Sequence, residues 1–140
     1  MDLRKGFTIS ELVTVLALVA LVFALLTPAI TLIHRRMLRE GCADNLREMG
    51  TALYIYAREH EGRFPTELRE LFAQKYLTDE DVLDCPASEH VGTLSDPDYF
   101  YTGGLSITSP SKAPLLRDKE GNHAGGRKNM LNVKGEILFE

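Results

Sequence analysis

The hydrophobic and polar positions divide the chain into an apolar stretch, an amphipathic stretch and a mixed remainder. The first stretch, residues 12–33, holds 22 residues without a charged side chain. At a rise of about 1.5 Å per residue, a helix of this length spans about 33 Å, enough to cross the hydrocarbon core of a bilayer. We therefore predict a membrane-spanning helix over residues 12–33.

From residue 35 to about residue 60 the pattern becomes amphipathic. Apolar side chains recur at spacings of three and four, which places them on one helix face; they are Leu38, Cys42, Leu46, Met49, Leu53 and Tyr56. Gly41 and Gly50 weaken such a helix by about 1 kcal/mol each without ending it. Gly62 followed by Pro65 does end it. The prediction is one helix of some 50 residues, whose apolar stripe faces the core of a head domain rather than a coiled-coil partner.

The remainder predicts short elements. Residues 66–72 are typical of a short helix that Thr66 caps, with Leu68, Leu71 and Phe72 on its buried side, and a helical turn starts at Thr78 with Asp81 at capping-box spacing. Strands are predicted at residues 99–102, 114–117, 129–133 and 136–139, the last two as a hairpin with a two-residue turn, Lys134-Gly135. The predicted fold class is α+β, with one long N-terminal helix packed on a small head that carries a C-terminal antiparallel sheet.

The charge of the chain argues against some functions. The net charge is −4, and the part from Gly41 onward carries 17 Asp and Glu against 11 Lys and Arg. Nucleic-acid binding needs a basic face to neutralise phosphates, so we expect no nucleic-acid partner. The sequence shows no pairing of a nucleophile with a base and no phosphate-binding loop, and we predict that the protein is not an enzyme.

Glu11 stands at the edge of the apolar stretch, where an ionised carboxylate is costly unless it is paired. One alternative is that its side chain simply reaches to the membrane interface. The other is pairing with a positive charge, but no Lys or Arg lies between Lys5 and Arg35. A cut just before Phe7 would create an α-amino group four residues from Glu11, and this amine on a neighbouring copy could supply the charge.

A cleaved secretory signal is a competing interpretation of the N-terminus. Thr27-Pro28-Ala29 loosely matches a small-x-small cleavage site. The apolar run continues beyond it through Ile30, Leu32 and Ile33, however, without the polar stretch expected after cleavage. We therefore expect the helix to be retained.

Pro28 lacks an N–H for the carbonyl of Ala24, so a kink is expected near it.

The segment from Lys5 to Leu12, KGFTISEL, followed by a long apolar run, resembles the type III signal of type IV pilins and of type II secretion pseudopilins. The resemblance implies that a prepilin peptidase cuts between Gly6 and Phe7 and methylates the new N-terminus. Glu11 is then the fifth mature residue, and Pro28 is similar to a proline common in the family. The expected function is a filament subunit, assembled with other pilin or pseudopilin subunits by an inner-membrane platform.

The resemblance also implies a domain organisation. Residues 1–6 would be the cleaved leader, 7–33 the transmembrane half of the helix, 34–62 its amphipathic half and 63–140 the head. The head would lie in the periplasm of a bacterium, on a single-pass inner-membrane anchor. Charge counting points the other way, since Arg35, Arg36 and Arg39 outnumber Arg4 and Lys5. The alternative function is a membrane-anchored periplasmic enzyme or binding module that uses the helix only as a tether.

The head is similar to bacterial pseudopilin-like proteins with an H-x9-DG ending. The matching segments are residues 42–46, Tyr56-Ala57, residues 62–65, Cys85-Pro86 and residues 123–127 with Gly135. Lys134 stands where that motif has Asp, and the interval from His123 to the glycine is one residue longer, so a role of that Asp does not carry over. We expect His123 to order a loop by hydrogen bonding rather than to bind a ligand.

Cys42 and Cys85 are the two cysteines of the chain. In an exported head they would meet an oxidising compartment, so we predict a disulfide between them, which would close 42 intervening residues and contribute about 3–4 kcal/mol. A buried free thiol is the alternative for Cys42. Zinc is not expected with so few ligands. Calcium at residues 96–98 and 118–122 is an alternative that the spacing does not favour, because acidic turn residues are usually just solvated.

Overall fold

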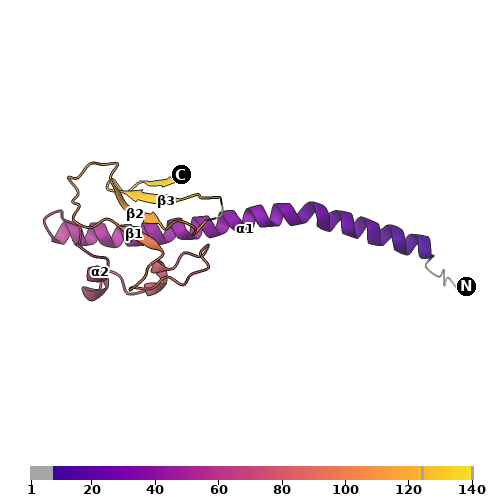
Figure 1. Cartoon of the computed structure of the whole chain (residues 1–140), viewed down its shortest axis with the longest axis horizontal. Helices are drawn as coiled ribbons and strands as arrows, with labels where there is room; N and C mark the ends of the chain where they lie inside the picture. The colour runs from indigo at the N-terminus through magenta and orange to yellow at the C-terminus, as the bar shows by residue number, and fades with distance from the viewer. Residues whose placement is uncertain (1–7, 124, 140) are drawn as a thin grey trace, which may run out of the picture. The chain divides into compact units, whose positions relative to one another are not determined.

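The computed structural model describes residues 8–123 and 125–139. Its elements, in chain order, are α1 (Ile9–Glu59), α2 (Arg69–Ala73), the 3-10 helix η1 (Glu80–Leu83), β1 (Tyr99–Tyr101), β2 (Pro114–Asp118), β3 (Asn129–Asn132) and β4 (Ile137–Phe139) (Figure 1). The chain divides between Arg36 and Met37 into two compact units, here called the anchor unit and the head unit. The α+β class predicted from the sequence is confirmed.

Helix α1 confirms the prediction of one long N-terminal helix. It ends as the sequence predicts: the N–H of Gly62 donates to the carbonyl of Ala57 at 2.8 Å, and Gly62 has a φ of 80°. Such a left-handed residue after the last turn is how helices commonly terminate. Glu61 also adopts a positive φ, 55°, so two successive residues turn the chain away from the helix axis.

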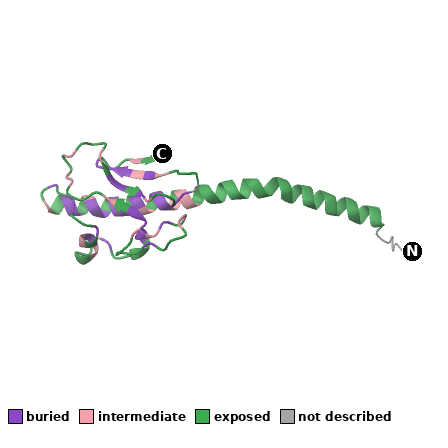
Figure 2. Cartoon of the chain, viewed as in Figure 1, coloured by how far each residue is buried: buried purple, intermediate pink, exposed green. Residues whose placement is uncertain are grey.

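In the anchor unit, every described side chain, residues 8–36, is exposed (Figure 2). Its large apolar side chains include Phe23, Leu25 and Leu32, each at least 66% exposed. By length and composition α1 can cross a membrane, and no residue of its most apolar 18-residue stretch is buried within the chain. Apolar surface of this extent is stable only against lipid or another protein.

The head unit has a hydrophobic core built on the predicted stripe of α1. Of the six stripe residues, Leu38 is half-buried and the other five are buried. The cluster around them takes residues from every element that follows except β4: Leu71 from α2, Leu83 from η1, and Tyr99, Leu115, Leu116 and Leu131 from the sheet. The amphipathic pattern therefore identified the face of α1 on which the head folds.

The sheet is antiparallel, with strand order β1-β2-β3-β4. The strands lie along the C-terminal half of α1 in Figure 1. The four predicted strands are confirmed, each within two residues at either end. The hairpin turn was predicted wrongly as two residues. Asn132 pairs with Glu136 through N–H to O at 3.1 Å, and Gly135 donates to the carbonyl of Asn132 at 2.9 Å. The loop therefore has three residues, with Gly135 at a φ of 86° in the position that favours glycine.

Two predicted caps are wrong in their residue. Helix α2 begins at Arg69, and the carboxylate of Glu70 accepts the N–H groups of Thr66 and Glu67, at 2.8 and 3.0 Å, instead of the Thr66 side chain capping the helix. At η1 the cap is Asp79, which accepts the N–H of Asp81 at 3.0 Å, and not Thr78. A carboxylate accepts an N–H more strongly than a hydroxyl does, so the acidic neighbour takes over in both cases.

Candidate functional site

Gly6 and Phe7, the residues of the predicted processing site, lie outside the described residues. Glu11 is described, and it is exposed in the first turn of α1. Its Oε2 accepts two hydrogen bonds from Thr8, one from the backbone N–H at 2.9 Å and one from the hydroxyl Oγ1 at 2.8 Å. The N–H of Glu11 in turn faces Oγ1 of Thr8 at 3.4 Å.

These contacts form a capping box, in which the N-cap residue and the third helical residue satisfy each other's N–H groups. The Thr-x-x-Glu spacing in the sequence is the signal for this motif, which the charge of Glu11 alone does not indicate. The structure therefore adds a local role: Glu11 closes the N-terminal end of α1. The hydrogen bonds do not neutralise the carboxylate, and among the described residues Glu11 has no ion pair.

Pro28 lies inside α1, and the helix continues on both sides of it. The hydroxyls of neighbouring threonines bond to backbone carbonyls of the same region: Thr27 to Phe23 O at 2.6 Å and Thr31 to Pro28 O at 2.9 Å. Such bonds keep polar side chains satisfied within the helix, where no water is available in a bilayer. The kink expected at Pro28 stays a prediction.

The predicted disulfide is confirmed. Cys42 and Cys85 are bonded, with Cα atoms 5.2 Å apart, and both residues are fully buried. The bond joins α1 to the segment after η1, so it closes the loop that contains both short helices. Gly41, the residue before Cys42, makes room for this segment, since a Cβ there would lie 3.3 Å from Cγ of Pro86. The free-thiol alternative for Cys42 is wrong.

Buried polar side chains surround the disulfide. Asp98 accepts the N–H of Cys85 at 2.9 Å, and Asp118 accepts the N–H of Asn129 at 2.8 Å. His123, 7% exposed, places Nε2 2.8 Å from Oδ2 of Asp118 and 3.8 Å from the sulfur of Cys85. Oδ1 of Asp118 is buried and has no hydrogen-bond partner among the described residues. His123 thus ties the loop that carries it to β2 and the disulfide, as expected of a loop-ordering residue.

A metal could in principle use this cluster, because ligand atoms of Cys42, Cys85 and His123 lie within 4.8 Å of one another. A cysteine binds a metal as a thiolate, however, and here the sulfurs of both cysteines are joined in the disulfide. The nitrogen of His123 that faces them is also engaged with Asp118. The oxidised head therefore offers no set of ligands at this position.

The segments considered for calcium come together in space, since the N–H of Lys119 donates to the carbonyl of Asp98 at 3.0 Å. The carboxylates of Asp96 and Asp98 already have partners. Asp96 pairs with Lys119, which holds its pKa below the ordinary value, and with Nε2 of His90 at 3.2 Å. Asp98 bonds to Nδ1 of His90 at 2.9 Å. Lys119 supplies positive charge to Asp96, and His90 occupies an oxygen of each of Asp96 and Asp98, so the geometry does not favour calcium.

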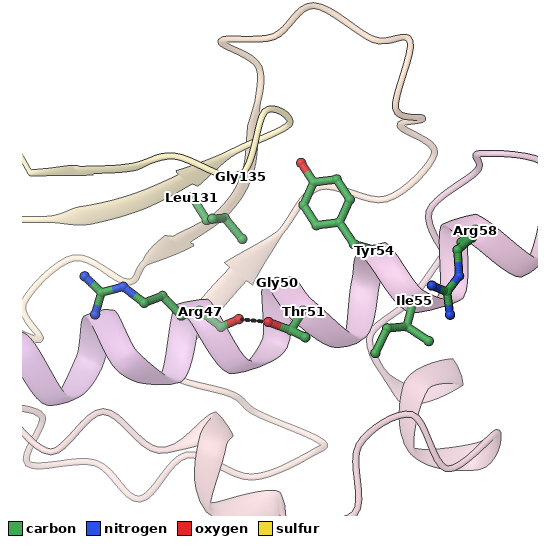
Figure 3. A pocket seen from close by; sticks show the side chains of 8 residues that line it. All are labelled: Arg47, Gly50, Thr51, Tyr54, Ile55, Arg58, Leu131 and Gly135. Carbon is green, nitrogen blue, oxygen red and sulfur yellow. Dashed lines mark hydrogen bonds between the residues drawn. The ribbon is translucent and has the colours of Figure 1, made fainter.

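A groove of about 570 Å³ runs between α1 and the β3–β4 hairpin (Figure 3). Its lining residues are Arg47, Gly50, Thr51, Tyr54, Ile55, Arg58, Leu131 and Gly135. Leu131 packs closely on Gly50 of α1, where a Cβ would lie 2.6 Å from Cδ2 of Leu131 and would require that side chain to shift. The Tyr54 hydroxyl donates to the carbonyl of Val133 and fixes the ring in the groove.

Sequence reasoning missed this groove and the polar cluster at the disulfide. The groove needs the hairpin to lie on α1, which no local pattern encodes. A signal for the cluster existed in part, because Asp98 and Asp118 border predicted strands, but nothing indicated that they would be buried. Arg47 and Arg58 belong to the polar face of the amphipathic helix, and nothing in the sequence distinguishes them from the other charged residues of that face.

The described part of the chain therefore presents three sites of interest. They are the capped N-terminal turn with Glu11, the cluster of buried polar side chains beside the disulfide, and the α1 groove. None of the three combines a nucleophile with a base and an open cavity for substrate, the arrangement that acyl or phosphoryl transfer would need. Comparison with protein-family models, with curated proteins and with solved structures finds no match to this chain.

Proposed function

We propose that the chain is a pilin-like filament subunit, held in a membrane by residues 12–33 until a prepilin peptidase cuts it between Gly6 and Phe7 and an inner-membrane platform assembles it. The family resemblance of residues 5–12 supports the processing step. The long exposed apolar part of α1 and the stapled α+β head support the role of a building block. The head lies on the periplasmic side in this proposal.

The observation that carries the proposal is the state of Glu11. Its carboxylate receives two hydrogen bonds from Thr8 but no positive charge from any described residue. A charged group beside 22 uncharged residues is costly in lipid, and hydrogen bonds reduce that cost without removing it. A subunit whose carboxylate meets a free amine on a neighbour is therefore more stable in the filament than alone in the bilayer.

The capping box makes this pairing geometrically simple. Because Glu11 bonds the N–H of Thr8, its carboxylate lies at the very end of the helix, where cleavage before Phe7 leaves a free amine. The exposed position of Glu11 leaves the carboxylate open to an amine from outside the chain. Pairing between copies then fixes the axial register of one α1 against the next.

The processing step is tested by the mass of the mature protein from its native cells. We expect a chain that begins at N-methylated Phe7. A functional chain that retains residues 1–6 contradicts the proposal and favours the alternative of a simple tether.

The role of Glu11 is tested with Glu11→Gln and Glu11→Leu. Glutamine keeps an acceptor for the Thr8 N–H and removes only the charge, whereas leucine removes both. We expect both variants to be processed and both to be depleted in sheared filaments, with Thr14→Val, which loses only a bond to Ser10 O, as the matched control. Normal incorporation of Glu11→Gln would show that the cap, and not the charge, is what assembly needs.

A further inference from the structure

Of the two arginine side chains that line the α1 groove, one has no ion-pair partner among the described residues. Arg47, at one end, pairs with Asp44 of the preceding turn. The side chain of Arg58, at the other end, has no ion pair or hydrogen bond with any described residue. Beside it Ile55 is 37% exposed, whereas Leu131, which also lines the groove, is only 2% exposed (Figure 3). The groove is therefore suited to a ligand with an acidic group next to an apolar one.

The head unit also exposes a segment of that chemistry. Val91 is 71% exposed, more than any other large apolar side chain of the head. Glu89, two residues earlier, is exposed and makes no ion pair or side-chain hydrogen bond within the described chain. Both residues lie in the loop that follows the disulfide, and the neighbouring residue His90 ties this loop to Asp98 at 2.9 Å. The loop therefore presents an acidic and an apolar side chain, and the contact between His90 and Asp98 holds the loop in place.

Other exposed apolar side chains of the described head lack a free acid beside them. Near Met37, which is 64% exposed, Glu40 already has a partner within the chain. Next to Leu94, the carboxylate of Asp96 is held by Lys119; next to Leu138, that of Glu136 is held by Lys134. Phe100 and Phe139 lie under the guanidinium groups of Arg117 and Arg39. Ile107 has no acidic residue within three positions. Within the described head, Glu89 with Val91 is the combination that matches Arg58 with Ile55.

We propose that the Glu89–Val91 loop of a second copy of this chain occupies the α1 groove. Glu89 pairs with Arg58, and Val91 packs on Ile55. This inference rests on the proposed function and identifies a head-to-head contact of the filament. The groove and the loop share no lining residue and do not pair within one molecule, so the contact joins two different surfaces. A contact of this kind repeats from copy to copy and builds an open helical filament unless the rotation closes a ring.

Charge exchange tests the pairing in the native cells with the full chain. Arg58→Glu and Glu89→Arg each bring like charges together, and we expect each to lower the amount of sheared filament at least about threefold, the scale of an exposed ion pair. The double variant restores the attraction with the signs exchanged and recovers most of the filament. Arg69→Glu and Glu80→Arg make the same charge changes outside the groove and leave the amount unchanged. A double variant no better than the singles, or singles no worse than the controls, overturns the proposal.

A cross-link provides the second measurement. One tagged copy carries Ile55→Cys and another carries Val91→Cys; the native cysteines are bonded and buried, so only the new thiols are free to react. We expect an oxidant to link the two copies, and no link when Ile107→Cys replaces Val91→Cys. If the chain is uncut and forms no filament, the proposed function fails, while a 55–91 link still establishes the groove contact. Filaments without this link overturn the groove contact and leave the proposed function standing.

Discussion

The anchor unit and the head unit contain the same helix but obtain their stability in different ways. From residue 8 to residue 36 no described side chain is buried, whereas the second half of α1 buries nine residues under the head. The described anchor unit has helical hydrogen bonds but no buried core, so its apolar surface depends on lipid or on another protein. The head unit has its own core and a disulfide. The comparison shows that a helix pattern specifies local structure, while the surroundings decide what its apolar face is for.

The largest expected effect on the head is loss of the disulfide. Cys42→Ser together with Cys85→Ser should lower the free energy of unfolding by about 3–4 kcal/mol, since the bond restricts the unfolded chain. All five tyrosines lie in the head unit and tryptophan is absent, so tyrosine fluorescence during urea unfolding in detergent reports on the head alone. The helical circular dichroism of the anchor unit should persist. Coincident loss of both signals would contradict the division into two units.

A matched pair of leucines tests the comparison within one helix. Leu46 is fully buried, and Leu46→Ala should destabilise the head by about 3 kcal/mol through the cavity that it leaves. Leu21 is 56% exposed, and Leu21→Ala should leave the tyrosine unfolding curve unchanged. A shift of that curve by Leu21→Ala would mean that the anchor unit contributes to head stability after all.

The acid stability of the head depends on Glu70. Burial opposes ionisation of its carboxylate, but donors from Glu67, Tyr56 and Thr66 outweigh this and hold its pKa below the ordinary 4.5. A carboxylate whose pKa is lower in the folded than in the unfolded state stabilises the fold at pH values above the unfolded-state pKa. This contribution begins to fall below about pH 4.5 and is lost as the pH passes through the folded-state pKa. Glu70→Gln should therefore cost about 1 kcal/mol at pH 7, because solvent screens this partly exposed group, and little at pH 3. An equal loss at both pH values would exclude the charge as the cause.

The smallest expected effect concerns the cap of η1. Asp79→Ala removes the acceptor of the Asp81 N–H and should cost about 0.5–1 kcal/mol, whereas Thr78→Ala should cost nothing measurable. Urea unfolding of the two variants, followed by tyrosine fluorescence, measures the difference. If Thr78→Ala were the more damaging of the two, the cap predicted from the sequence would be right.

Elements with a strong local pattern could be predicted. The apolar run, the stripe from Leu38 to Tyr56 and the terminator at Gly62 defined α1, because each depends on neighbours along the chain. The strands followed from short apolar runs between turn residues. The errors are local as well: two acidic residues took the caps assigned to Thr66 and Thr78, and the hairpin loop has one residue more than expected.

Of the candidate site, the sequence by itself determined the charged position at Glu11, its distance from a possible cut before Phe7, and the two cysteines. Only the tertiary structure decided that these cysteines bond to each other, that Asp98 and Asp118 are buried beside them, and that a groove opens next to Arg58. The physical reason is distance along the chain. Contacts between α1 and residues 40 to 90 positions later depend on how the sheet packs on the helix, and no local preference records that packing.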